Sequence, residues 1–110
     1  MKIVLCCAGG FSTTMLMDRM KNTVKESKKL KEEDFKFEAI PVDLLEKEID
    51  ECDVVVVGPQ IAHKLDYIES ITKPKDIPYV VIDQDTYGKM DGATSLKLAI
   101  LAYRKAKQSK

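Results

Sequence analysis

Two adjacent cysteines, Cys6 and Cys7, end an apolar run near the start of the chain and precede a loop without charged side chains. A thiol close to a helix N-terminus is expected to have a lowered pKa and to be nucleophilic. Small residues let a backbone wrap closely around an anion, and amides and hydroxyls can donate hydrogen bonds to it. Residues of these kinds follow Cys7 directly, together with one aromatic residue: Ala8, Gly9, Gly10, Phe11, Ser12, Thr13 and Thr14. The spacing predicts a reactive thiol beside an anion-binding loop at the start of a helix.

The two thiols of this pair are not equivalent. Side chains alternate along a strand, so Cys6 and Cys7 are expected to point to opposite sides. Cys6 is in phase with Val4 and is predicted to pack in the core as a small hydrophobe. Cys52, before a later apolar run, is predicted to be buried in the same way. Cys7 begins the loop and is the predicted nucleophile.

The elements that would position this loop follow an alternating pattern. Four apolar runs predict strands, at residues 2–6, 35–40, 53–57 and 79–82. Helical spacing predicts four helices, one beginning at residue 13 and the others at residues 42–50, 61–68 and 94–107. This order predicts an α/β fold with a single-domain, open, four-stranded parallel sheet in the order 2-1-3-4 and helices on both faces.

Details of this assignment can be tested in the structure. The second strand alternates in polarity, so it is expected at an edge of the sheet, and Pro41 is expected to end it. The helix at residues 42–50 is expected to direct Leu44, Leu45 and Ile49 inward. Residues 83–92 are rich in turn formers and are predicted to be a loop.

In an open parallel sheet, ligands bind beyond the carboxyl ends of the strands, where the winding reverses. With the predicted order, that crevice lies between the first and third strands. The first loop there contains Cys7, and the second contains Gly58, Pro59 and Gln60. Tyr87, in the last loop, is predicted either to approach the thiol or to cover the end of the sheet.

Length and charge set further limits. The 110 residues suffice for one domain, residues 1–110, and the balance of 18 basic against 18 acidic residues gives no net field for nucleic acid. No apolar run approaches the roughly 20 residues that cross a bilayer, and the N-terminal run lacks the features of a signal peptide. The expectation is a cytoplasmic protein without membrane insertion. His63, the only histidine, is predicted to lie on the surface, and neither a metal nor another cofactor is expected.

Three segments together resemble the lactose/cellobiose-type enzyme IIB of the bacterial phosphoenolpyruvate-dependent sugar phosphotransferase system. They are the loop from Cys7 to Thr13 (CAGGFST), the stretch from Asp53 to Ile61 (DVVVVGPQI) and the last loop with Val81 to Asp83, Tyr87 to Lys89 and Asp91-Gly92. The first loop also resembles the Cys-x5-Arg-Ser/Thr phosphate loop of low-molecular-weight tyrosine phosphatases, with Thr13 at the place of the arginine.

The resemblance to the IIB family implies a phosphotransferase that works through a phosphocysteine. A phosphohistidine on a IIA partner would pass its phosphoryl group to Cys7, and Cys7 would pass it to a sugar held by the membrane IIC transporter. The sugar implied is a β-linked disaccharide such as cellobiose, chitobiose or lactose.

Other functions remain open from the residues alone. A small thiol-dependent phosphatase would need the missing loop arginine and an acid such as Asp83 or Asp85. A non-catalytic module with a redox or regulatory thiol is a further alternative. Disulfide exchange is disfavoured because Cys6 and Cys7 are adjacent and point apart. A nucleotide-binding P-loop is disfavoured because no lysine follows Gly10.

Overall fold

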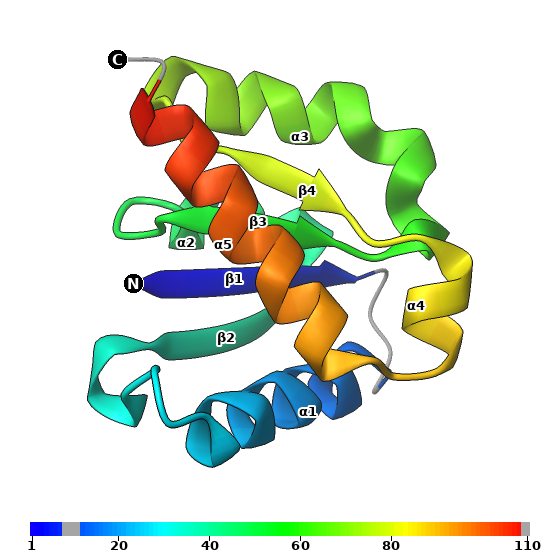
Figure 1. The fold of residues 1–110 in the computed structure, drawn as a ribbon. Coiled ribbons are helices and arrows are strands. Elements are labelled where there is room, and N and C mark those ends of the chain that lie inside the picture. The colour runs from blue at the N-terminus through cyan, green and yellow to red at the C-terminus, as the bar shows by residue number, and fades with distance from the viewer. Residues whose placement is uncertain (8–11, 109–110) are drawn as a thin grey trace.

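The computed structural model describes residues 1–7 and 12–108, and its four strands form one parallel sheet (Figure 1). The strands are β1 (Lys2–Cys7), β2 (Lys36–Pro41), β3 (Val54–Val57) and β4 (Tyr79–Val81). Their spatial order is β2-β1-β3-β4, and each neighbouring pair is parallel. The predicted order is confirmed, including the place of β2 at an edge.

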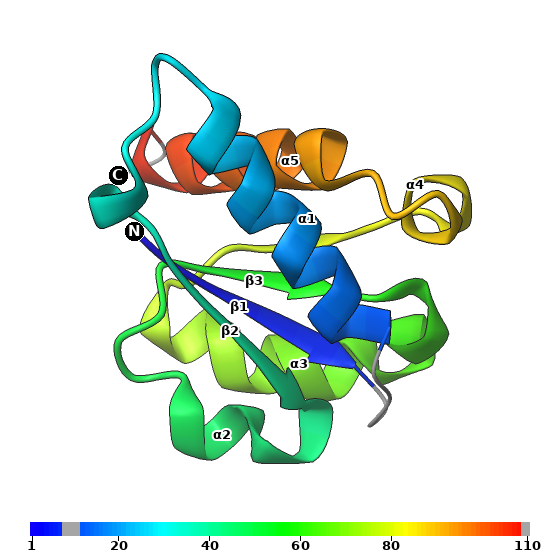
Figure 2. The same ribbon diagram turned by 90° about the horizontal axis from the view of Figure 1, so that it is seen from below.

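Helices cover both faces of the sheet, as predicted. They are α1 (Ser12–Glu26), α2 (Leu45–Glu48), α3 (Leu65–Thr72), α4 (Gln84–Gly88) and α5 (Gly92–Gln108). Short 3₁₀ turns connect them, namely η1 (Glu32–Asp34), η2 (Val42–Leu44), η3 (Pro59–Lys64) and η4 (Lys73–Lys75). Figure 2 shows α1 and α5 on one face of the sheet and α2 and α3 on the other. In the part of the chain that is described, no helix is both long enough and apolar enough to cross a membrane.

Alternation along the central strands divides the core into two layers. Val54 and Val56 of β3 pack with residues of α1 and α5, whereas Val55 and Val57 pack with residues of α2 and α3. Strands buried on both faces read as continuous apolar runs, which explains the four consecutive valines of β3. In β1, Cys6 belongs to the layer of α2 and α3, so its predicted core position is confirmed.

α1 and α5, which cover the same face of the sheet, approach each other closely at Gly92, the first residue of α5. A Cβ atom at this position would lie 2.6 Å from the carbonyl oxygen of Arg19 and 2.7 Å from its Cβ. No side chain fits in that space, so glycine allows α5 to rest against the backbone of α1. The start of α5 therefore fixes where α1 lies over the sheet.

Two expectations about helices were wrong. Leu44 is 42% exposed, because residues 42–44 form the η2 turn and α2 begins only at Leu45, which shifts the inward-facing phase. Residues 83–92 are not a continuous loop. Asp83 caps α4, and its side chain accepts a hydrogen bond from the backbone amide of Thr86.

Several boundaries also differ from those expected, and three of them concern the site or the edge of the sheet. Residues 61–68 divide into η3 and α3, because Ile61 has non-helical dihedral angles (φ −114°, ψ 19°). β2 ends at Pro41 as expected, but Pro41 is itself the last residue of the strand, which is tolerated at an edge where no ladder bond is lost. Cys7 likewise ends β1 instead of opening the loop.

Candidate functional site

The thiol of Cys7 lies at the carboxyl end of β1. The side chain is 8% exposed, and Sγ donates to the carbonyl oxygen of Ile40 at 3.8 Å, near the end of β2. Alternation puts Cys7 on the face of the sheet that α1 and α5 cover, opposite to Cys6. α1 begins five residues after Cys7 along the chain, at Ser12, so the thiol and the positive end of the α1 dipole belong to the same corner of the fold.

The other two cysteines are core residues. Burial, together with the nearby Cys52 and Cys7 thiols, raises the pKa of Cys6 to about 12. Burial also raises the pKa of Cys52 to about 11, and Cys52 Sγ donates to the carbonyl oxygen of Val54 at 3.0 Å. Both thiols are therefore protonated near neutral pH and are poor nucleophiles. The core positions predicted for Cys6 and Cys52 are confirmed.

The loop after β3 begins beside the carboxyl end of β1, as the sheet order predicts. The amide of Gly58 donates to the carbonyl oxygen of Cys6 at 3.2 Å, directly before Cys7. A Cβ atom at Gly58 would lie 2.9 Å from Gln60 Oε1 and 3.5 Å from Tyr87 Cε2. The side chains of Gln60 and Tyr87 therefore lie over Gly58, and only the flexible end of Gln60 would have to move to admit a side chain here.

Tyr87 links α4 to the first turn of α1. Its hydroxyl lies 3.2 Å from Thr13 Oγ1, within hydrogen-bond distance, and both residues are buried, at 5% and 2% exposure. Tyr87 comes from α4, and Thr13 comes from the first turn of α1. The prediction that Tyr87 covers the end of the sheet agrees with its place in the core layer of α1 and α5. The bond to Thr13 was not predicted, because nothing local to either residue marks a partner 74 positions away.

The remaining predicted site residues differ in exposure. Thr14 and Gln60 are exposed, and Pro59 is half-buried. His63 is exposed, which confirms its surface position. Several residues of the predicted anion-binding loop lie outside the described residues, namely Ala8, Gly9, Gly10 and Phe11, as does the side chain of Ser12.

The two acids that a phosphatase could use are engaged elsewhere. The carboxylate of Asp83 accepts hydrogen bonds from the amide and hydroxyl of Thr86, at 3.0 and 2.6 Å, and these bonds lower its pKa. Asp85 pairs with Lys89 at 3.1 Å on the surface. A general acid that protonates a leaving group near neutral pH needs a raised pKa, so Asp83 is poorly suited to that role.

Within residues 1–7 and 12–108, no group of three His, Cys, Asp or Glu side chains comes together in a way that could hold a metal ion. The groups described near the carboxyl end of the sheet are the Cys7 thiol, the paired hydroxyls of Thr13 and Tyr87, and the amino end of α1. Such groups suit the binding of an anionic group and a nucleophilic step on it.

Known proteins share this fold. The chain is 39% identical to the cellobiose-specific phosphotransferase IIB component protein of Borrelia burgdorferi, whose solution structure matches with a TM-score of 0.78 over 96% of this chain and 94% of the other. The fold also matches the lactose-specific IIB component domain from Streptococcus pneumoniae, with a TM-score of 0.75, 13% identity, and coverage of 94% of this chain and 97% of that chain.

Sequence comparison leads to the same group of proteins. The chain is 28% identical over 99 residues to the oligo-beta-mannoside-specific EIIB component of Bacillus subtilis (strain 168), covering 90% of this chain and 92% of the relative. The sequence model of the family described as "PTS system, Lactose/Cellobiose specific IIB subunit" matches residues 2–98. The chain therefore belongs to the lactose/cellobiose-specific IIB subunit family and is a component of a sugar-transporting phosphotransferase system.

Proposed function

We propose that Cys7 carries a phosphoryl group between a phosphohistidine of a IIA protein and a sugar bound by a membrane IIC transporter. The observation that carries the proposal is the contrast among the three thiols. Cys7 ends β1 ahead of the amino end of α1, whereas Cys6 and Cys52 are core residues whose pKa values burial raises. Of the three, Cys7 is the one suited to act as a nucleophile.

Two displacements at phosphorus would complete the cycle. In the first, the Cys7 thiolate attacks the phosphohistidine phosphorus, so the S–P bond forms while the N–P bond breaks and its electron pair returns to the imidazole. In the second, a sugar hydroxyl attacks, so an O–P bond forms, the S–P bond breaks and the hydroxyl proton is lost to solvent. Such transfers depend on in-line positioning and on donors for the phosphoryl oxygens. The backbone amides of residues 8–13 and the hydroxyls of Ser12 and Thr13 are the proposed donors.

Nearby residues would support this loop without touching the phosphorus. Tyr87 holds the Thr13 hydroxyl at 3.2 Å, and its ring lies beside Gly58, where a Cβ atom would be in ordinary contact with Tyr87 Cε2 at 3.5 Å. Thr14, Pro59 and Gln60 are proposed to border the same region from the two loops. Thr13 stands where the related phosphatase loop has arginine, and a neutral hydroxyl should hold the phosphoryl group less tightly than a guanidinium would. Weaker holding favours onward transfer.

The partners follow from the family. The proposal includes a IIA phosphohistidine protein, a IIC transporter and a β-linked disaccharide as acceptor, such as cellobiose, chitobiose or lactose. Relatives named for cellobiose and for oligo-β-mannosides support that sugar class. The whole chain, residues 1–110, would act as one IIB domain in the cytoplasm, without a cofactor.

Intact mass spectrometry tests the proposal. The protein is incubated with a phosphorylated IIA protein, and a gain of one phosphoryl group is expected in wild-type protein and in the Cys6→Ser variant. Cys7→Ser should show no gain, because its hydroxyl is not ionised near neutral pH. The matched Cys6→Ser variant controls for the loss of a neighbouring thiol. Acceptance by Cys7→Ser, or its loss only in Cys6→Ser, would contradict the assignment. Steady release of inorganic phosphate would favour a phosphatase instead.

A further inference from the structure

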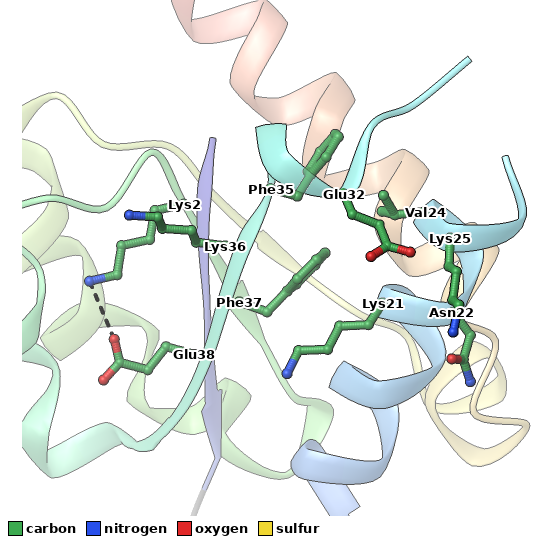
Figure 3. Close-up of a pocket in the computed structure, with 10 residues that line it drawn as sticks. All are labelled: Lys2, Lys21, Asn22, Val24, Lys25, Glu32, Phe35, Lys36, Phe37 and Glu38. Carbon is green, nitrogen blue, oxygen red and sulfur yellow. Dashed lines mark ion pairs between the residues drawn. The ribbon is translucent and has the colours of Figure 1, made fainter. Parts of the chain in front are cut away.

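A groove runs along the free edge of β2, at the end of the sheet opposite to Cys7. Its volume is about 590 Å³. Its lining residues come from α1, η1, the start of β1 and β2: Lys2, Lys21, Asn22, Val24, Lys25, Glu32, Phe35, Lys36, Phe37 and Glu38. Figure 3 shows Phe35 and Phe37 on the side of β2 that faces α1, while Lys2, Lys36 and Glu38 lie on the other side. The groove therefore wraps around the edge of the strand.

The backbone of β2 has unused hydrogen-bonding capacity along this groove. The amide of Lys36 donates to the carbonyl oxygen of Met1 at 2.8 Å. Lys36 and every second residue after it, Glu38 and Ile40, therefore direct their backbone N–H and C=O groups toward β1. In a parallel ladder the intervening residues, Phe37 and Ala39, direct theirs outward. No strand among the described residues pairs with this edge. The backbone of Pro41 also faces outward, but proline has no N–H to donate, so the row of available hydrogen-bonding groups ends there.

The side chains along the groove add apolar surface and positive charge. The rings of Phe35 and Phe37 stack with centroids 6.2 Å apart and are half-buried. Lys2 pairs with Glu38 at 3.3 Å. The other charged lining residues are three exposed lysines, Lys21, Lys25 and Lys36, and one glutamate, Glu32. The groove thus has an excess of positive charge on both sides of an apolar pair of rings.

We propose that this groove binds an extended acidic peptide segment of a partner protein, which adds to the sheet as a fifth strand beside β2. Its backbone would bond to the outward groups of Phe37 and Ala39. Its apolar side chains would contact the two rings, and its carboxylates, alternating with them, would lie near the lysines. Strand addition of this kind takes affinity from main-chain bonds and specificity from alternate side chains.

A second copy of the chain fits the edge less well. Two copies joined edge to edge by a two-fold axis would place both α1 helices on the same face of the shared sheet. Lys21 and Lys25 of each copy would then face the same seam, where like charges repel. An acidic partner meets the opposite situation, because the same lysines attract it.

The docking site is separate from the proposed phosphoryl site. Ala39, the proposed contact nearest to that site, pairs with Leu5, two residues before Cys7 and about 7 Å from it along the strand direction. A bound segment that ends beside Ala39 would therefore leave the carboxyl end of β1 open. Failure of the docking proposal would not affect phosphoryl acceptance by Cys7, which is measured independently.

A titration followed by amide NMR tests the proposal with a short capped peptide of alternating glutamate and valine as the probe. Saturable shifts are expected at Phe37 and Ala39, and hydrogen exchange of these two amides should slow on binding. A peptide with lysine in place of glutamate should not bind. A peptide with a central proline should bind much more weakly, because it cannot complete the ladder.

Protein variants separate strand addition from simple charge attraction. Lys21→Glu with Lys36→Glu should weaken binding by about tenfold, since exposed pairs each contribute modestly and reversal replaces attraction by repulsion. Lys97→Glu, an exposed position of α5 outside the groove, is the matched control and should bind normally. Equal binding of the proline peptide, or shifts that leave the Phe37 and Ala39 amides unaffected, would overturn the proposal. So would an absence of binding, or a dimer joined through β2.

Discussion

The buried hydroxyl pair of Thr13 and Tyr87 should show energetic coupling between α1 and α4. The two oxygens are 3.2 Å apart, and both side chains are almost fully removed from solvent. Tyr87→Phe removes one hydroxyl and keeps the ring, whereas Thr13→Val removes the other and keeps the shape. Either change leaves the opposite hydroxyl buried without this bond.

The size of the effect follows from that burial. A buried polar group that loses its partner costs about 1–3 kcal/mol, whereas removal of both partners can be nearly neutral. We therefore expect each single variant to lower the free energy of unfolding by about 1–2 kcal/mol. The double variant should lose less than the sum, with a coupling energy of about 1 kcal/mol.

Urea unfolding of the four proteins, followed by circular dichroism, measures this cycle. With a slope of about 1.5 kcal/mol per molar urea, a loss of about 1 kcal/mol lowers the midpoint by about 0.7 M. Tyr79→Phe is the matched control, because the Tyr79 hydroxyl bonds to Glu69 at an exposed site and its loss should matter little. If the two single effects add to within about 0.4 kcal/mol, the hydroxyls do not interact and the link between α1 and α4 is not as described.

Three further predictions concern other parts of the fold. Gly92→Ala should destabilise the protein by about 1–3 kcal/mol, because its Cβ would enter the backbone of α1, whereas Gly88→Ala, whose Cβ would meet nothing within 4 Å, should be neutral or slightly stabilising in the same urea assay. Cys6 should resist iodoacetamide at pH 8 in the folded protein and react on unfolding, since burial raises its pKa to about 12; rapid native labelling would contradict its core position. Asp83 and Asp91 cap helices, and their pKa values are lowered mainly by hydrogen bonds from the side chains and amides of Thr86 and Thr94. Their stabilising effect should therefore be complete above about pH 4 and be lost as the pH falls further. Replacing both aspartates by asparagine should make the thermal stability vary less with pH across that acid range.

The sheet could be predicted from sequence because its strands are short apolar runs with a distinct period. The four valines of β3 need burial on both faces, and the alternation of β2 fits an edge, so the strand order followed from few alternatives. The opposite directions of Cys6 and Cys7 followed from the same period. These features depend on local spacing, which a single sequence displays.

The missed features depend on local capping or on distant contacts. α4 is only five residues long and is started by the Asp83 cap, a signal equally typical of a turn. The apolar spacing of residues 42–50 predicts one helix with Leu44 inward, but a 3₁₀ turn precedes α2 and changes the angle between successive side chains. The close contact of Gly92 with α1 depends on tertiary packing, and a lone glycine at a helix start gives no sign of its neighbour.

The bond between Thr13 and Tyr87 also has a consequence for the order in which the protein folds. It joins residues 74 positions apart, so a long chain segment must be closed before it can form. The pairing of β1 with β2 closes a much shorter segment and does not require α4. Contacts of high sequence separation form late when closer ones can form first. A chain emerging during synthesis can therefore assemble β1 and α1 early, yet it acquires the surroundings of Cys7 only after its last third has folded.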